Sequence, residues 1–148
     1  MTQTTVNISN RITPDYITRL PNKNYIFVYG SNLAGIHGSG AAKDAKDRFG
    51  ATWGRCHGLD NNSYGIPTKD ESIKTLPLTR IAKYVQNFID DAKIDEVHTF
   101  LVTKIGCLRA GYNPDDIAPM FKGAIELENI HLPIEFWNVL LQNTKKDG

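Results

Sequence analysis

A continuous apolar run, Tyr25 to Tyr29, constrains the fold of this chain more than any other feature. A strand with one solvated face alternates apolar and polar residues, whereas a continuous run is typical of a parallel strand covered on both faces. A glycine-rich loop, residues 30–40, follows the run. Apolar residues at positions 41, 42, 45 and 49 then have helical spacing, and Gly50 is a typical helix stop. Strand, loop and helix in this order predict an α/β fold.

Three further segments have the composition of strands. Residues 63–68 predict a short strand that ends near Pro67, because proline removes a donor from the hydrogen-bond ladder. Residues 97–103 predict a second buried strand, and residues 134–141 contain a predicted last strand. Residues 55–62 have too little pattern for an assignment.

Two further helices have recognisable beginnings. Thr79 is expected to cap a helix whose apolar face recurs between residues 81 and 92. Asn113 is expected to cap another helix, with Pro114 at its first position and Pro119 bending it. We therefore predict a three-layer α/β domain with a mixed, mostly parallel sheet and helices on both faces.

Length and charge limit what such a domain binds. The 148 residues correspond to a single domain, 1–148, with a core over residues 24–141 between polar N- and C-terminal tails. The 17 Lys and Arg against 16 Asp and Glu leave a net charge of +1. A surface that coats DNA or RNA is therefore not expected, whereas a compact anion needs only a few donors.

Cysteine content and hydropathy predict the compartment. Cys56 and Cys107 are too few for a disulfide framework, and no spacing of Cys and His suggests a zinc site. No apolar run approaches the roughly 20 residues of a membrane span, and the polar residues 1–10 do not resemble a secretory signal. We expect a cytoplasmic protein whose cysteines are free thiols or core residues, and which has no metal, cofactor or membrane partner.

Two glycine-rich loops, residues 35–40 and 106–111, each follow a predicted strand and precede a predicted helix. Ligands of α/β sheets bind at this end of the strands, where glycine lets backbone N–H groups approach a phosphate. Two such loops at one edge of a sheet predict a diphosphate ligand. The first loop lacks the Lys-Ser/Thr of a P-loop and the third glycine of the dinucleotide fingerprint, so ATP hydrolysis and NAD-dependent oxidoreduction are disfavoured.

Ser31-Asn32-Leu33 with the loop Gly35 to Gly40 and the alanine-rich helix behind it resembles the first ligand loop of macrodomains. Thr103 to Tyr112 resembles their second loop, and Ile66-Pro67-Thr68 lies between the two in the same order. The stretch from Tyr25 to Trp137 resembles a macrodomain-like group of bacterial and phage proteins. The resemblance implies the macrodomain fold and binding of ADP-ribose or a relative, and some macrodomains hydrolyse ADP-ribosyl bonds.

The expected ligand-binding residues come from both loops and from the strand end between them. They are Ser31, Asn32, Gly35, His37, Gly38, Ser39, Gly40, Thr68, Gly106, Cys107, Arg109, Ala110, Gly111 and Tyr112. The resemblance assigns Asn32 to the ribose of the ligand. Lys69 and Asp70, just after the strand end, are the candidate acid–base or nucleophile pair, so the expected catalytic residues are Asn32, Lys69 and Asp70.

For several of these residues a structural role stays open. Asn32 is also a typical turn cap, Lys69 and Asp70 also fit a charged loop, and His37 is either a proton or phosphate donor or an exposed loop histidine. Tyr112 either stacks on a ligand or covers the core. Cys107 is expected to have a lowered thiol pKa, because it lies in a loop before a helix.

Two positions depart from the macrodomain pattern. Asn24 replaces the usual Asp that holds the adenine amino group, although Asn24 is able to accept a similar hydrogen bond. Leu108 replaces a usual glycine of the second loop, and its Cβ restricts backbone contact with phosphate, for which Arg109 offers a charge. Phe136 and Trp137 are expected in the core, with one of them a candidate wall for adenine.

Three hypotheses about function follow. The first is an ADP-ribosyl hydrolase that binds an ADP-ribose-type or other NAD-derived nucleotide. The second is a module without turnover, which reads ADP-ribosylated targets or, in a phage, sequesters a NAD-derived signal against host defence. The third is a structural domain whose loops merely turn. The sequence leaves the oligomeric state and the particular ligand undecided.

Overall fold

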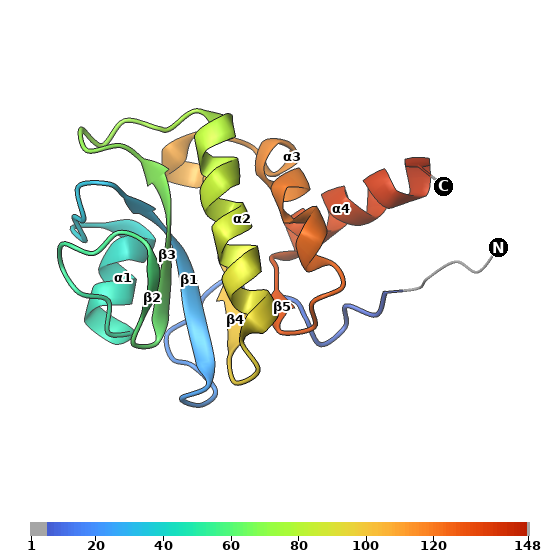
Figure 1. Ribbon diagram of the computed structural model, residues 1–148, viewed down its shortest axis with the longest axis horizontal. Coiled ribbons are helices and arrows are strands. Elements are labelled where there is room, and N and C mark those ends of the chain that lie inside the picture. The colour runs from blue at the N-terminus through green and yellow to red at the C-terminus, as the bar shows by residue number, and fades with distance from the viewer. Residues whose placement is uncertain (1–5, 148) are drawn as a thin grey trace.

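The computed structural model describes residues 6–147, and the side chains of residues 6–142. A five-stranded sheet with the strand order β2-β3-β1-β4-β5 forms its centre (Figure 1). Strand β1 (Tyr25–Asn32) pairs in parallel with β3 (Ser63–Lys69) and with β4 (Thr99–Val102). The short strand β5 (Ile130–His131) is parallel to β4, and β2 (Gly58–Asp60) is antiparallel to β3.

The two faces of β1 enter two different hydrophobic clusters. Phe27 and Tyr29 pack with Phe49 and with helix α1 (Gly40–Arg48). Ile26 and Val28 enter the larger cluster on the other face. That cluster takes residues from α2 (Leu78–Ile94), α3 (Pro114–Ile117), the 3₁₀ helix η2 (Ala118–Ala124) and α4 (Ile134–Asp147).

Burial of β1 on both faces agrees with its continuous apolar run. The predicted α/β fold with a mixed, mostly parallel sheet is confirmed, and the placement of the helices is compatible with three layers.

No helix within residues 6–147 has the length and apolar character needed to span a bilayer. Of the predicted polar tails, residues 1–5 and Gly148 lie outside the described residues.

The helix ends follow local chemistry. Gly50 has a φ of +81° directly after the C-cap of α1, the left-handed conformation in which glycine often ends a helix. Asn113 is the N-cap of α3 with Pro114 at the first position, as predicted, and its N–H donates to Asp116 Oδ2 at 3.1 Å. The predicted cap at Thr79 is wrong by two positions, because α2 begins at Leu78 after the N-cap Pro77.

The last predicted strand, residues 134–141, is wrong because this segment belongs to helix α4. Phe136, Trp137 and Leu140 are all buried, and their spacing places them on one helical face. The N–H groups of Phe136 and Trp137 donate to the carbonyl of Pro133, which begins the helix. The backbone of residues 143–147 continues α4, so the tail predicted from residue 143 is helical up to Asp147.

Candidate functional site

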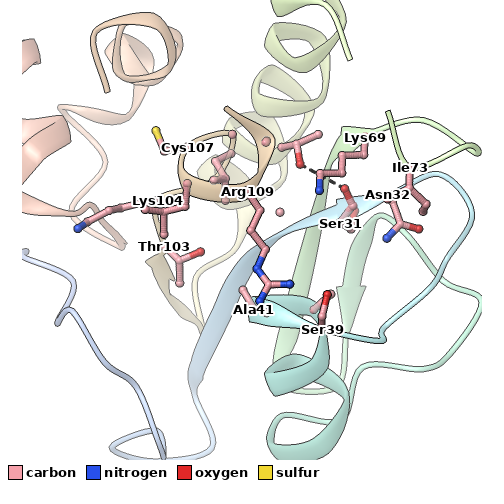
Figure 2. Close-up of a pocket in the computed structure, with 18 of the residues that line it drawn as sticks. Ser31, Asn32, Ser39, Ala41, Lys69, Ile73, Thr103, Lys104, Cys107 and Arg109 are labelled. Carbon is pink, nitrogen blue, oxygen red and sulfur yellow. Dashed lines mark hydrogen bonds between the residues drawn. The ribbon is translucent and has the colours of Figure 1, made fainter. Parts of the chain in front are cut away.

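A cleft of about 340 Å³ opens where β1, β3 and β4 end, at their carboxyl ends. Its volume lies at the lower end of the roughly 300–1,000 Å³ of small-molecule sites. The lining residues are Gly30, Ser31, Asn32, Ile36, Gly38, Ser39, Gly40, Ala41, Ala42, Thr68, Lys69, Ile73, Thr103, Lys104, Ile105, Gly106, Cys107, Leu108, Arg109 and Ala110. Both glycine-rich loops therefore face one hollow (Figure 2).

The first loop is held by the side chain of Asn32. Its Nδ2 donates to the carbonyl of Ile36 at 2.9 Å, and its Oδ1 accepts the N–H of Ile36 at 3.0 Å. Gly35 does not line the cleft, because it packs against Gly54, whose N–H donates to the Gly35 carbonyl at 2.8 Å. Asn32 thus has the turn-capping role that the sequence left open, and its amide is already engaged on both sides.

His37 points into the protein and does not line the cleft. The side chain is 2% exposed, so neither the exposed loop histidine nor the ligand contact expected from the sequence is found. Its Nδ1 lies 3.0 Å from the carbonyl of Gly35, and its Nε2 lies 3.1 Å from the hydroxyl of Tyr29. A carbonyl only accepts, so Nδ1 carries the proton and Nε2 accepts from Tyr29, whose pKa burial raises to about 12. Burial also lowers the pKa of His37.

Helix α1 begins at the cleft, and the backbone N–H groups of its first turn have no acceptor among the described residues. Ser39 is its N-cap and makes no capping hydrogen bond with its side chain. The N–H groups of Gly40, Ala41 and Ala42 donate to no group within residues 6–147, and the first bond of the helix is that of the Lys43 N–H to Ser39 at 3.2 Å. Unsatisfied N–H groups and the positive end of the helix dipole favour an anion at this position.

Arg109 reaches from the second loop toward this helix end. A Cβ built on Gly40, which has a φ of +61°, would lie 3.6 to 3.7 Å from the Cδ, Nε and Cζ atoms of Arg109. Figure 2 shows the Arg109 guanidinium beside Ser39 and Ala41. Arg109 is exposed and forms no ion pair with any described residue. The positive charge of Arg109 therefore adds to the partial positive charge at the start of helix α1.

The second loop contains the 3₁₀ helix η1 (Leu108–Ala110). Gly106 has a φ of +74°, and a Cβ at this position would lie 2.6 Å from Ile117 Cδ1, so glycine is required for packing as well as for conformation. Leu108 also has a positive φ, +57°, a backbone conformation that favours glycine. Among described groups, the N–H groups of Gly106, Leu108 and Arg109 have no hydrogen-bond acceptor.

Cys107 is a buried thiol, and the lowered pKa expected from its loop position is wrong. The residue is 8% exposed, and burial raises the pKa of the thiol to about 11. Figure 2 shows its sulfur directed away from Arg109. A protonated thiol is a weak nucleophile, so the residue contributes backbone rather than chemistry to the cleft.

Lys69 lines the cleft, whereas Asp70 does not. The Asp70 carboxylate accepts the N–H groups of Ser72 and Lys74 at 2.8 and 3.0 Å, and these bonds hold the turn that follows β3. The same hydrogen bonds lower the pKa of Asp70. The expected pairing of Lys69 with Asp70 as an acid–base pair is therefore not found in the cleft.

Two further expected residues of the second loop lie outside the cleft. The Tyr112 hydroxyl donates to the carbonyl of Leu76 at 2.8 Å and its ring packs on the core, which is the covering role that the sequence left open. Gly111 has a φ of +92° and ends η1 in the left-handed conformation.

Thr68 and Ser31 do line the cleft, but both are only 4% exposed. The Thr68 hydroxyl donates to the carbonyl of Ser31, and the Ser31 hydroxyl donates to the carbonyl of Cys56.

The groups expected for adenine also lie elsewhere. Asn24 precedes β1 and is at the opposite end of the strand from the cleft. Phe136 and Trp137 are fully buried in the core, so neither forms a wall of the cleft. Ile36, Ile73, Thr103 and Lys104 were not expected in the lining. Two sequence signals pointed to Lys104: it directly follows a predicted strand, and it lies in the stretch Thr103 to Tyr112 that resembles a ligand loop.

The charge of the cleft is entirely positive. Lys69, Lys104 and Arg109 line it, and the described lining residues include no Asp, Glu or His. Lys104 pairs with Glu135 at 2.7 Å, which leaves Lys69 and Arg109 as cations without an ion pair among the described residues. The described residues hold no group of three or more His, Cys, Asp or Glu suited to a metal ion. The arrangement is suited to a compact anion.

Comparison with known proteins found no match to a family model, a curated protein or a solved structure.

Proposed function

We propose that the cleft binds the diphosphate of an NAD-derived nucleotide of the ADP-ribose type. The observation that carries the proposal is that both glycine-rich loops line a single cleft at the carboxyl ends of parallel strands. The start of α1 behind the first loop supplies three backbone N–H groups without an acceptor among the described residues, and the second loop supplies three more. Backbone donors at a helix start are a recurrent phosphate site, and two sets of them are suited to two phosphates.

The cations strengthen this assignment. Arg109 belongs to the second loop and extends to the start of α1, so its guanidinium adds a positive charge beside the first set of donors. Guanidinium groups bind phosphate through two parallel hydrogen bonds, and no carboxylate among the described lining residues competes for it. The resemblance of both loops to those of macrodomains supports ribose next to the diphosphate.

Binding without turnover is favoured over hydrolysis of an ADP-ribosyl bond. A hydrolase requires a group that activates water within hydrogen-bond reach of the substrate. Asp70 is engaged in a turn outside the cleft, the Asn32 amide is engaged with Ile36, and His37 is buried. Lys69 alone remains of the expected catalytic residues with a free side chain in the lining. The proposed role is therefore that of a binding module that reads or sequesters the nucleotide.

Isothermal titration calorimetry with ADP-ribose tests the proposal. Arg109→Ala is expected to weaken binding about 10- to 100-fold, because it removes a charge-assisted contact worth roughly 1.5–3 kcal/mol. Arg19→Ala is the matched control, since Arg19 is an exposed arginine that does not line the cleft. Equal losses in the two variants, or no heat with ADP-ribose and with pyrophosphate, would overturn the proposal.

Turnover is measured separately by incubating the protein with ADP-ribosylated peptide and with ADP-ribose. Recovery of unchanged ligand is expected. Release of free peptide that is lost in Lys69→Ala would instead support the hydrolase hypothesis, with Lys69 as its catalytic residue.

A further inference from the structure

Three of the residues that line the cleft have exposed aliphatic side chains. Ile36, Ile73 and Leu108 line it and are 40%, 42% and 79% exposed. Ile73 lies on the turn after β3, and Leu108 lies in the second loop. Thr75 Oγ1 donates to the carbonyl of Ala110 at 2.8 Å, so these two segments are joined directly beside the cleft. Aromatic side chains are not found among the described lining residues.

Ile73 and Leu108 share a costly backbone conformation. Within residues 6–147 the non-glycine residues with positive φ are Asn61, Ile73 and Leu108, at +54°, +62° and +57°. Asn tolerates this region, whereas a β-branched or bulky residue there is a true outlier. Two of the three line the same cleft, and both project an apolar side chain into solvent. Strain of this kind persists where the surrounding structure imposes it, and it clusters at ligand sites.

The turn that carries Ile73 is imposed by Asp70. Its Oδ1 accepts the N–H groups of Ser72 and Lys74 on either side of Ile73, and its carbonyl accepts the Ile73 N–H at 3.1 Å. Asp70 is thus a positioning residue that acts on the cleft through Ile73. The Asp70 carboxylate therefore affects the cleft by holding the turn of Ile73, although Asp70 itself does not line the cleft.

We propose that Ile73 and Leu108 form an aliphatic clamp that holds the flat face of a nucleobase at the mouth of the cleft. The inference rests on the proposed function, because the phosphates of the same ligand would bind the backbone N–H groups and the cationic side chains of the cleft. Aliphatic side chains contact a base through its faces and do not read its edges. Among the described lining residues, the one side-chain amide is that of Asn32, and it is engaged with Ile36. The clamp therefore selects nucleoside diphosphates over pyrophosphate with little preference among bases.

Calorimetry with ADP, GDP, UDP and pyrophosphate tests the clamp in the wild-type protein. The three nucleotides are expected to bind within about threefold of one another and each about tenfold more tightly than pyrophosphate, the gain from covering two exposed aliphatic side chains. A preference for one base above tenfold would overturn the clamp, because it requires contacts with the base edges. Nucleotides that bind no better than pyrophosphate would also overturn it, yet leave the phosphate site intact. Failure of all four ligands and of ADP-ribose would instead reject the proposed function.

Variants separate the clamp from the phosphate site. Ile73→Gly and Leu108→Gly keep the positive φ without strain, so both are expected to fold, to lose most of the tenfold nucleotide advantage and to bind pyrophosphate as the wild type does. Asn61→Gly is the matched control at a positive φ outside the cleft. An unchanged nucleotide advantage in both clamp variants would refute the proposal.

The role of Asp70 is tested by conservative rescue. Asp70→Asn keeps an acceptor oxygen for the Ser72 and Lys74 N–H groups and is expected to bind nucleotides as the wild type does. Asp70→Ala is expected to lose the nucleotide advantage while its affinity for pyrophosphate stays unchanged. Equal loss in both variants, or loss of pyrophosphate binding, would argue against a positioning role through Ile73.

Discussion

The imidazole of His37 lies between the Tyr29 hydroxyl and the Gly35 carbonyl, and both of its nitrogens are satisfied in the neutral form. Burial lowers its pKa below the ordinary value of 6.5. As the pH falls through 6.5, the unfolded chain takes up a proton that the folded protein resists, so the free energy of unfolding decreases.

We therefore expect stability to fall as the pH is lowered from 7 through the ordinary histidine pKa, by at most about 1.4 kcal/mol per pH unit from this group. Urea unfolding of the wild type and of His37→Gln at several pH values measures the effect. The variant should have a shallower pH dependence, and His131→Gln reports the second imidazole whose pKa is lowered by burial. Parallel profiles for the wild type and His37→Gln would contradict the prediction.

At Leu108, the expected effect of a substitution on stability is opposite to its expected effect on nucleotide binding. Its left-handed conformation costs roughly 1–2 kcal/mol, against about 0.5–1 kcal/mol for the extra chain entropy of glycine. Because the side chain is 79% exposed, little packing is lost on its removal. Leu108→Gly is expected to raise the free energy of unfolding by about 0.5–1 kcal/mol. A decrease measured by urea unfolding would show that the leucine side chain stabilises the unliganded protein.

The connections between elements depend on close backbone approach at Gly35. A Cβ on Gly35 would lie 2.6 Å from the backbone Cα, C and O atoms of Gly54, and the loop has no flexible side chain there that is able to yield. A Cβ on Gly54, which has a φ of +96°, would meet nothing within 4 Å. The two glycines thus share a positive φ but differ in the space around them.

Gly35→Ala is expected to cost about 2–4 kcal/mol, because overpacking adds to the conformational strain, and Gly54→Ala about 1–2 kcal/mol from strain alone. Thermal unfolding of the two variants provides the comparison. A cost for Gly54→Ala equal to that for Gly35→Ala would show that conformation alone explains both positions.

At the scale of the whole molecule, Arg11 joins the N-terminal segment to the C-terminal third of the chain. Its guanidinium donates to the carbonyls of Ala124, Ile125, Leu127 and Ile130 at 2.7 to 3.2 Å. It also lies 4.8 Å from the centre of the Trp137 ring, and the indole Nε1 donates to the Arg11 carbonyl at 2.8 Å. A buried guanidinium is stable here because the carbonyls around it use all three of its nitrogens.

Arg11→Lys is expected to destabilise the protein by about 2–4 kcal/mol, since one ammonium group does not satisfy carbonyls placed for a planar fork and leaves buried acceptors unpaired. Arg19→Lys at an exposed position should change stability by less than about 0.5 kcal/mol. Chemical unfolding of both variants tests this, and a loss below about 1 kcal/mol for Arg11→Lys would mean that charge alone is sufficient.

Local patterns predicted the elements near β1 well and those near the C-terminus poorly. The continuous run of β1, the stripe of α1 and the caps at Gly50 and Asn113 depend on a few neighbouring residues, and the structure agrees with them. Residues 134–141 contain apolar pairs that fit a strand or a helix, and packing of Phe136 and Trp137 on the core decided for the helix.

The sequence by itself determined the α/β class and the two glycine-rich loops behind parallel strands, because strand burial, glycine content and helix caps act between residues close in the chain. Only the tertiary structure decided which loop residues face the cleft. His37, Asp70 and Tyr112 are polar loop residues that sequence cannot distinguish from ligand contacts, and each bonds to a partner inside the protein. Ile73 and Leu108 became visible only through their positive φ and their exposure beside the cleft, because both properties are imposed by the folded backbone around them.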